Sequence, residues 1–177
     1  MRLQSLIHLA RLVGEMVSSK SIGVFGSASL LATHPTLGDG GMPLERTFDA
    51  DLLVQPSDEL TARMLREAIG EGSAFSEKNG YHADILRPEI LDTLPQGWEK
   101  RLVPLPSVPT AKCLHPLDLA LVKLVLGREK DLSLLHALLK LKLLDAESLL
   151  RHYHATPLGE REAFAVGRNL QKLLPKA

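Results

Sequence analysis

The sequence predicts an α+β protein in which an N-terminal α/β half is followed by a helical half. Short apolar runs bounded by Gly, Pro and Ser occur in the first half, which is typical of buried strands. From Pro116 onward, apolar residues recur at helical spacing. The proline-rich residues 94–110 lie between these two patterns. We therefore place the domain boundary there and predict an α/β domain at residues 1–110 and a C-terminal helical domain at residues 111–177.

The first domain is expected to begin with a helix, a strand and a tight turn. Apolar residues at helical spacing predict an amphipathic helix from Leu3 to Val17, and residues 21–25 form a short apolar run typical of a buried strand. The pair Gly26-Ser27 predicts a turn into a second helix with the sequence SASLLATH. Residues 34–45 follow, with three glycines and no periodicity, and we expect them to form a flexible loop.

Local signals also predict a capped helix and a hairpin further along the first domain. Ser57 or Asp58 is expected to cap a helix, because either side chain can accept a hydrogen bond from the first turn. Two extended runs flank Asn79-Gly80, the dipeptide that a type I′ turn favours, so we predict a β-hairpin there. The outgoing strand of this hairpin has the sequence YHADIL.

The helical half divides into four predicted helices. PLDLALVKLVL ends at a break at Gly127, EKDLSLLHALLK follows it, and DAESLLRHYHA forms the third segment. The fourth helix is expected to open at Thr156-Pro157, where cap and first-turn residues stand in the order that a helix start requires.

Composition restricts the class of protein and its surroundings. Of the 177 residues, 45% are hydrophobic and 24% are charged, which is the balance of a globular chain rather than a disordered one. The single Cys113 has no partner for an internal disulfide, and no apolar run has the length of a membrane span. We therefore expect a cytoplasmic protein with no membrane association.

Charge is distributed unevenly although the net charge is zero. Residues 1–100 hold 9 Lys/Arg against 14 Asp/Glu, a balance of −5, and residues 101–177 hold 12 against 7, a balance of +5. The zero net charge argues against nonspecific polycationic binding of nucleic acid. An acidic half followed by a basic half is consistent with a triphosphate bound between them, and equally with chance and solubility.

The segment ERTFDADLLV contains the most informative pattern of the chain. Asp49 and Asp51 stand two residues apart, so in a strand both carboxylates point to one face, while Phe48, Ala50 and Leu52 point to the other. Two carboxylates at this spacing repel one another and are best stabilised by a divalent cation with hard oxygen ligands. The natural occupant is Mg²⁺, with Mn²⁺ as the alternative, and substrate phosphates would complete its coordination.

The pair Gly26-Ser27 supplies a second element of such a site. Backbone N–H groups at the start of a helix bind anions, and a glycine lets a phosphate approach the chain closely. Ser27 could add a hydroxyl contact. Each of these two patterns alone is more often structural than catalytic.

Taken together, these motifs resemble the nucleotidyltransferase superfamily typified by DNA polymerase β. That family has a Gly-Ser turn after a strand, an Asp-x-Asp strand and a third acidic residue on a later strand, which Gly26-Ser27, DAD at 49–51 and Asp84 of YHADIL match. More narrowly, RTFDAD at 46–51 and PLDLALVKLVLGREKDLSLLHALL at 116–139 look like the minimal nucleotidyltransferases related to AbiEii toxins of toxin–antitoxin systems. The implied fold is a nucleotidyltransferase-like small mixed sheet flanked by helices, followed by a helical bundle. The gap between Ser27 and Asp49 is longer than the family usually has, so the loop at residues 34–45 is either a lid or substrate-contacting element or a tolerated surface insertion.

The resemblance also implies roles for individual residues. Asp49, Asp51 and Asp84 would be catalytic and would hold the metal, with Asp84 as third ligand or general base. Lys123 and Asp131 would be catalytic as well. The nucleotide would be bound by a set of polar and cationic positions, namely Gly26, Ser27, Lys123, Arg128 and Lys130. A structural interpretation of the last group competes with this one, because acidic residues suit a helix start and isolated basic residues are usually solvated.

Three functions follow from the resemblance. The first is an Mg²⁺-dependent enzyme that moves a nucleoside monophosphate from an NTP to a hydroxyl of an RNA or protein acceptor, with a cognate antitoxin as partner. The second is a small-molecule nucleotidyltransferase of the antibiotic-modifying type, which would need an acidic pocket for a cationic acceptor. The third is a non-catalytic member that binds nucleotide or a partner protein. All three acidic positions are present, which disfavours the third.

Overall fold

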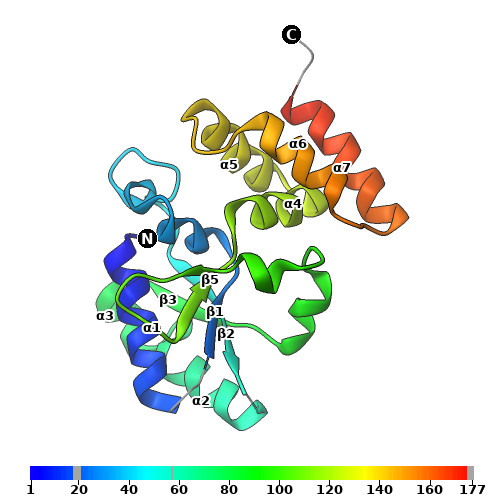
Figure 1. The fold of residues 1–177 in the computed structure, drawn as a ribbon. Helices are drawn as coiled ribbons and strands as arrows, with labels where there is room; N and C mark the ends of the chain where they lie inside the picture. Colours follow the sequence, from blue (N-terminus) through cyan, green and yellow to red (C-terminus); the bar gives the residue numbers. More distant parts are fainter. Residues whose placement is uncertain (18–20, 57, 175–177) are drawn as a thin grey trace. The chain divides into compact units, whose positions relative to one another are not determined.

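The computed structural model describes residues 1–17, 21–56 and 58–174, and they form two compact units (Figure 1). The sheet unit consists of residues 1–90 and 101–115. The helical unit consists of residues 91–100 and the chain from Pro116 onward. Among the described residues, no helix combines the length and the apolar character that crossing a membrane requires.

The sheet unit is built on five strands in the order β3-β2-β1-β5-β4. Strand β2 pairs antiparallel with β1 and parallel with β3, while β1 also pairs parallel with β5, and β5 antiparallel with β4. The sheet is therefore mixed, and the predicted α+β class with a small mixed sheet is confirmed. The strands are β1 (Ser21–Val24), β2 (Asp49–Gln55), β3 (His82–Ile85), β4 (Val103–Pro104) and β5 (Ala111–Cys113).

Three α-helices accompany the sheet, α1 (Leu3–Val17), α2 (Glu59–Ile69) and α3 (Ala74–Asn79). Helix α1 confirms the predicted amphipathic helix, because its buried residues recur at helical spacing. Asp58 caps α2 by accepting a hydrogen bond from the Thr61 N–H at 2.7 Å. This hydrogen bond is the main reason why the pKa of the Asp58 carboxyl lies below its ordinary value. Ser57, the alternative cap, lies outside the described residues.

The segment after Gly26 is helical as predicted, but it is a 3₁₀-helix, η1 (Ser27–Ala32), which ends two residues before the end of SASLLATH. The Ser29 N–H donates to the Gly26 carbonyl, and the Thr33 N–H to the Leu30 carbonyl, at the three-residue spacing of 3₁₀ geometry. Residues 28–31 are all buried. A segment with four consecutive buried residues has no solvent face, so tertiary packing decides its geometry.

Residues 34–45 belong to the sheet unit, and they contain a short helix and buried residues that the prediction of a flexible loop without periodicity did not include. A second 3₁₀-helix, η2 (Pro35–Gly38), begins the segment. Leu37 and Leu44 are fully buried and are linked by a hydrogen bond from the Leu44 N–H to the Leu37 carbonyl at 2.9 Å. Gly38 lies against the backbone of Met1, where an added Cβ would stand 2.0 Å from the Met1 carbonyl oxygen.

The predicted hairpin at Asn79-Gly80 is also wrong. The chain before Gly80 forms α3, whose N-cap Ser73 accepts a hydrogen bond from the Ser76 N–H at 3.1 Å. Gly80 has a φ of 73° and ends the helix, with its N–H bonded to the Ser76 carbonyl. A left-handed glycine serves a helix C-cap as well as a type I′ turn, so the dipeptide signal could not distinguish the two.

The helical unit confirms the predicted helices, with one shift. Gly127 breaks α4 from α5 at a φ of 60°. The last helix begins at Glu160 and not at Thr156-Pro157, because Thr156 ends α6 with its hydroxyl bonded to the His152 carbonyl at 2.7 Å. The α-helices of this unit are α4 (Pro116–Leu126), α5 (Glu129–Lys140), α6 (Ala146–Ala155) and α7 (Glu160–Leu173). Two 3₁₀-helices, η3 (Pro88–Thr93) and η4 (Trp98–Arg101), overlap its shorter stretch, residues 91–100.

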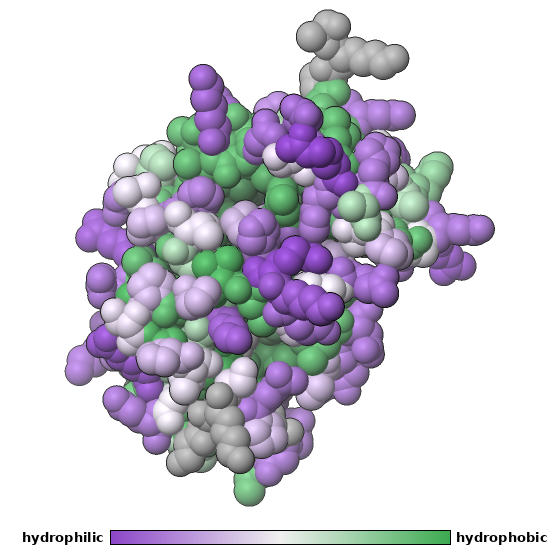
Figure 2. Space-filling view, viewed as in Figure 1, coloured by the Kyte–Doolittle hydropathy of each residue, from purple (hydrophilic) through white to green (hydrophobic). Residues whose placement is uncertain are grey.

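Some large apolar side chains stay exposed. On the visible face, apolar and hydrophilic residues are interspersed (Figure 2). Scattered apolar residues of this kind are normal on a globular surface. Those exposed among the described residues are Phe48, Leu60, Met64, Leu126, Leu141, Leu150 and Phe164.

Cys113 allows a test of the sheet core. It lies on β5 opposite Val24 and is fully buried, and this burial raises the pKa of its thiol to about 12. We expect a thiol reagent such as Ellman's reagent to label the native protein slowly at mildly alkaline pH and to label it fully in denaturant. The chain has one cysteine, so the absorbance reports this thiol alone. Immediate stoichiometric labelling of the folded protein would contradict the position of β5.

Candidate functional site

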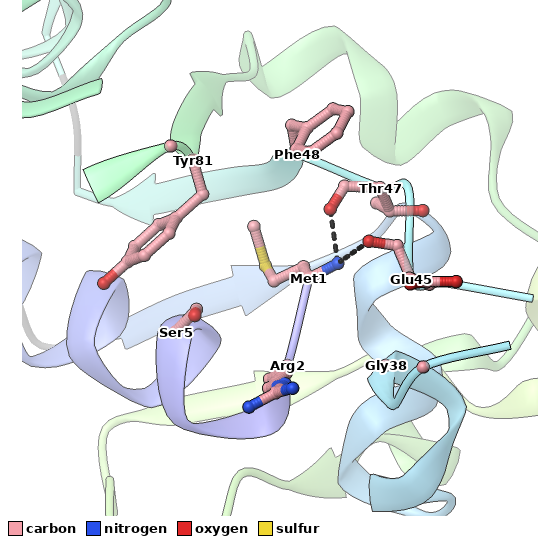
Figure 3. A pocket seen from close by; sticks show the side chains of 10 residues that line it. Met1, Arg2, Ser5, Gly38, Glu45, Thr47, Phe48 and Tyr81 are labelled. Carbon is pink, nitrogen blue, oxygen red and sulfur yellow. Dashed lines mark hydrogen bonds between the residues drawn. The ribbon is translucent and has the colours of Figure 1, made fainter. Parts of the chain in front are cut away.

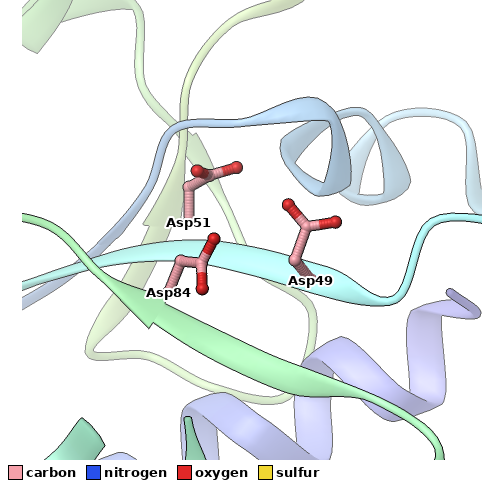
Figure 4. A group of neighbouring side chains, drawn as sticks. All are labelled: Asp49, Asp51 and Asp84. Carbon is pink, nitrogen blue, oxygen red and sulfur yellow. The ribbon is translucent and has the colours of Figure 1, made fainter. Parts of the chain in front are cut away.

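Three carboxylates of the sheet unit converge on one point. Asp49 and Asp51 project from β2 and Asp84 projects from β3 (Figure 4). Each offers one oxygen, and these oxygens all lie within 4.8 Å of one another. Asp49 and Asp51 are half-buried and Asp84 is exposed, so the cluster is open to solvent on one side.

The pairing of β2 with β3 creates this convergence. The two strands run parallel, with Asp51 directly opposite Asp84 and Asp49 opposite His82. Ala50 and Ala83 are buried on the other face, as the period-two alternation predicts. Phe48 departs from the prediction that it faces the core, because it precedes the first residue of β2 and its side chain is 56% exposed.

Gly26 is required by the close approach of Asp51. A Cβ added at Gly26 would stand 1.5 Å from Asp51 Oδ2, which is inside bonding distance. The φ of Gly26 is −83°, a value that any residue adopts, so the requirement concerns space and not backbone freedom. The Phe25 N–H donates to the Asp51 carbonyl at 3.0 Å and fixes the end of β1 beside the acidic strand. The Gly-Ser turn and the acidic pair are therefore neighbours in space.

Two serines follow Gly26 in η1. Ser27 begins the 3₁₀-helix and is half-buried. Ser29 is 1% exposed, and its hydroxyl has no hydrogen-bond partner among the described residues. Ser29 could not be recognised from sequence, because a serine inside SASLLA carries no signal of its burial.

His82 completes the surroundings of the carboxylates. Its Nε2 lies 3.7 Å from Asp84 Oδ1, and its side chain is 16% exposed while that of Asp84 is 52% exposed. The imidazole is thus held beside the most accessible carboxylate of the cluster. His82 and Asp84 stand two residues apart on β3, so strand alternation places both side chains on one face of the sheet.

The remaining predicted residues form a separate cluster in the helical unit. Lys123 Nζ donates to Asp131 Oδ1 at 2.9 Å, and Arg128 donates through Nε to Asp131 Oδ2 at 2.6 Å and through Nη2 to Oδ1 at 3.2 Å. Asp131 is fully buried and Lys123 nearly so, whereas Arg128 and Lys130 are exposed. The predicted site residues are therefore brought together in two groups, one in each unit.

The pKa of Asp131 reflects two opposing effects. Burial of the carboxyl on its own raises the pKa. The hydrogen bonds from Arg128 and Lys123, together with their positive charges, outweigh that effect and hold the pKa below its ordinary value. Asp131 is therefore an ionised acceptor that positions two cations.

The helical unit also contains a buried pair that the sequence analysis missed. His152 Nε2 lies 2.9 Å from Asp118 Oδ1, which joins α6 to α4. Asp118 is fully buried and the His152 side chain is 12% exposed. The only available signal was an aspartate inside the apolar run PLDLAL, since its partner is 34 residues away.

Replacing Lys123 with methionine tests the buried cluster. We expect Lys123→Met to lower the free energy of unfolding by about 3 kcal/mol, because a buried Asp131 loses one of its two cationic partners. Arg128→Met should cost less, since the Arg128 side chain is 53% exposed and exposed ion pairs contribute under about 1 kcal/mol. Urea denaturation of the three proteins measures both differences, and equal costs would contradict the cluster as described.

The pH dependence of this difference follows from the lowered pKa of Asp131. A carboxyl whose pKa is lower in the folded state contributes stability above its unfolded pKa, and this contribution is lost as the pH falls through the folded value. The gap in unfolding free energy between wild type and Lys123→Met should therefore be largest at neutral pH and should shrink below about pH 4.

Comparison with known families gives one match that covers nearly the whole chain. Residues 1–164 match the family described as nucleotidyltransferase of unknown function (DUF6036). Comparison with curated proteins and with solved structures found no match. The matched residues include both strands that carry the acidic cluster, as well as Lys123 on α4, Arg128 at the N-cap of α5 and Asp131 in its first turn. The chain therefore belongs to the family of nucleotidyltransferases of unknown function.

Proposed function

We propose that this protein is a metal-dependent nucleotidyltransferase that moves a nucleoside monophosphate from an NTP to an acceptor hydroxyl. The observation that carries the proposal is the convergence of Asp49, Asp51 and Asp84 within 4.8 Å beside the Gly26-Ser27 turn. Family membership supports the reaction class. The acidic cluster supports the dependence on a metal, because three carboxylates this close are costly without a cation between them.

The residues present suit Mg²⁺, or Mn²⁺ in its place. Their donor set consists of carboxylate oxygens only, which hard divalent cations prefer. The absence of a side chain at Gly26 leaves the Asp51 carboxylate its place in the cluster. When bound, such an ion supplies charge neutralisation for the phosphates and for the leaving pyrophosphate.

The chain itself supplies orientation and proton transfer. Asp49 and Asp51 are fixed on the first three residues of β2, so their carboxylates keep a set direction. Asp84 is the accessible member of the cluster, and we assign to it the proton of the acceptor hydroxyl. The hydroxyl oxygen then forms its bond to the α-phosphorus while the bond to pyrophosphate breaks. His82 beside Asp84 balances the charge of that carboxylate when the imidazole is protonated.

We assign the triphosphate contacts of the helical unit to its exposed cations. Arg128 and Lys130 are exposed and carry the charge-assisted donors that phosphates favour. Lys123 and Asp131 are buried against one another, so we assign them a positioning role toward Arg128. The resemblance of RTFDAD and of residues 116–139 to AbiEii-type enzymes supports a role as a toxin neutralised by a cognate antitoxin.

Asp49→Asn tests the proposed activity directly. We expect transfer of labelled nucleotide to an acceptor in bulk RNA or protein to fall by about a hundredfold or more, because the cluster loses one charge of the metal site. Asp39→Asn is the matched control, since Asp39 is an exposed carboxylate of the same unit outside the cluster. In the absence of NTP, Mn²⁺ should raise the melting temperature of wild type and of Asp39→Asn but not of Asp49→Asn. Transfer that survives Asp49→Asn would reject the site.

Gly26→Ala tests the space beside Asp51. The added methyl group must displace the Asp51 carboxylate, so Mn²⁺ affinity measured by calorimetry should fall about 10- to 100-fold. Gly14→Ala serves as the control, because Gly14 lies in α1 and an added Cβ would only touch Ile22 Cδ1 at 4.0 Å. That control should bind Mn²⁺ as wild type does and gain about 0.5–1 kcal/mol of stability. Equal Mn²⁺ affinities of the two variants would contradict the close approach.

A further inference from the structure

A pocket of about 260 Å³ lies at the end of the sheet where β2 and β3 begin (Figure 3). The start of α1, the segment 38–48 and the residues before β3 line it. Met1 lies between Phe48 and Tyr81 in this view, and its amino group donates to the carbonyls of Leu44, at 2.6 Å, and Thr47. None of the three cluster carboxylates lines this pocket.

Tyr81 forms a fixed aromatic wall of the pocket. Its hydroxyl is hydrogen-bonded to His8 Nδ1 at 2.7 Å. Its ring meets those of Phe75 and His8 edge to face, with centroids 5.6 Å and 6.2 Å away. The ring is therefore held from outside the pocket by two neighbours, and a ligand meets a preset surface.

Phe48 is the second aromatic residue of the pocket, and it is not held in this way. It is 56% exposed and makes no ring contact with any residue that the structure describes. It directly precedes Asp49, and its carbonyl accepts from the His82 N–H at 2.9 Å. An exposed ring in a chain with only 4% aromatic residues therefore stands next to the acidic cluster.

The pocket contains a cation that can meet a phosphate. Arg2 is exposed, lines the pocket and forms no ion pair with a described residue. The first turn of α1 contains no acidic residue, so its helix dipole is not compensated. Glu45 is the acidic member of the lining, and its carboxylate accepts a hydrogen bond from the Gly41 N–H at 2.9 Å.

We propose that this pocket binds one nucleobase of a single-stranded RNA acceptor, with Phe48 and Tyr81 contacting the base and Arg2 contacting the neighbouring phosphate. Aromatic rings that stack bases beside a guanidinium that meets the backbone are the means by which single strands are recognised. The pocket is smaller than the ~300–1,000 Å³ of ordinary ligand sites, so it suits one base and not a complete triphosphate. The identification of the RNA as an acceptor rests on the proposed function, whereas the binding itself does not.

Arg2, which forms no ion pair with a described residue, favours RNA over a protein as the acceptor. A base with its phosphate satisfies both the rings and Arg2, whereas a serine or threonine side chain would use neither.

The test measures RNA binding without catalysis. Fluorescence anisotropy of a labelled single-stranded RNA of about 12 nucleotides is recorded in EDTA and without NTP. We expect Phe48→Ala to weaken binding about tenfold and Phe48→Tyr to retain it, because stacking needs the ring. Arg2→Gln should weaken binding and reduce its salt dependence by about one phosphate contact. Phe164→Ala is the matched control, because Phe164 is a 73% exposed ring on α7 of the helical unit.

The outcomes distinguish this proposal from the proposed function. Loss of RNA binding in Phe48→Ala but not in Phe164→Ala supports the pocket, even when no protein transfers nucleotide and the enzymatic proposal fails. Unchanged RNA binding in Phe48→Ala, or an equal loss in Phe164→Ala, overturns the pocket, even when Asp49→Asn abolishes transfer. The RNA pocket would also be overturned if nucleotide transfer to a protein acceptor required Phe48 while RNA binding did not.

Discussion

The register between β2 and β3 is the constraint on which the candidate site depends. It sets Asp51 opposite Asp84 and places three carboxylate oxygens within 4.8 Å of one another. Such proximity is unfavourable without a cation, and buried neighbours of the two strands hold it in place. Ala50, Leu52, Ala83 and Ile85 are all buried on the opposite side. A slip of one residue in β2 would turn its carboxylates into this apolar layer, so the same burial that stabilises the sheet also fixes the acidic face.

The two units differ in the surroundings of their carboxylates. In the helical unit, Asp131 is buried and receives hydrogen bonds from Lys123 and Arg128, so its charge is compensated within the chain. In the sheet unit, three carboxylates lie within 4.8 Å of one another, and His82 lies 3.7 Å from Asp84. The first arrangement is compensated by contacts within its own unit, whereas the second has the oxygen donors that could hold a metal ion. The sequence does not show which aspartates are buried and paired with cations, because that depends on contacts that form only in the folded chain.

The sequence predicted those parts of the fold and site that depend on short-range periodicity. Alternation within DADLLV and YHADIL gave the acidic face, and helical spacing gave α1 and the helices after Pro116. The failures occurred where one local signal fits two structures. Gly80 serves a helix end as well as a hairpin turn, and SASLLA is buried on all sides, so its geometry follows from packing. The pocket at Phe48 could not be predicted from the sequence, because its lining comes from three segments that meet only in the folded chain.

The parallel pairing of β2 with β3 also bears on the order in which the protein assembles. Parallel neighbours require a crossover, and here α2 and α3 lie between the two strands. The three carboxylates therefore meet only after this long-range contact forms, and such contacts close late because the entropy of the intervening loop must be lost first. A nascent chain that has made β2 but not β3 has the acidic pair and lacks the third carboxylate. A cation at this cluster would therefore find its full set of carboxylates only in a chain whose sheet is complete, so it would select folded chains and would not nucleate folding.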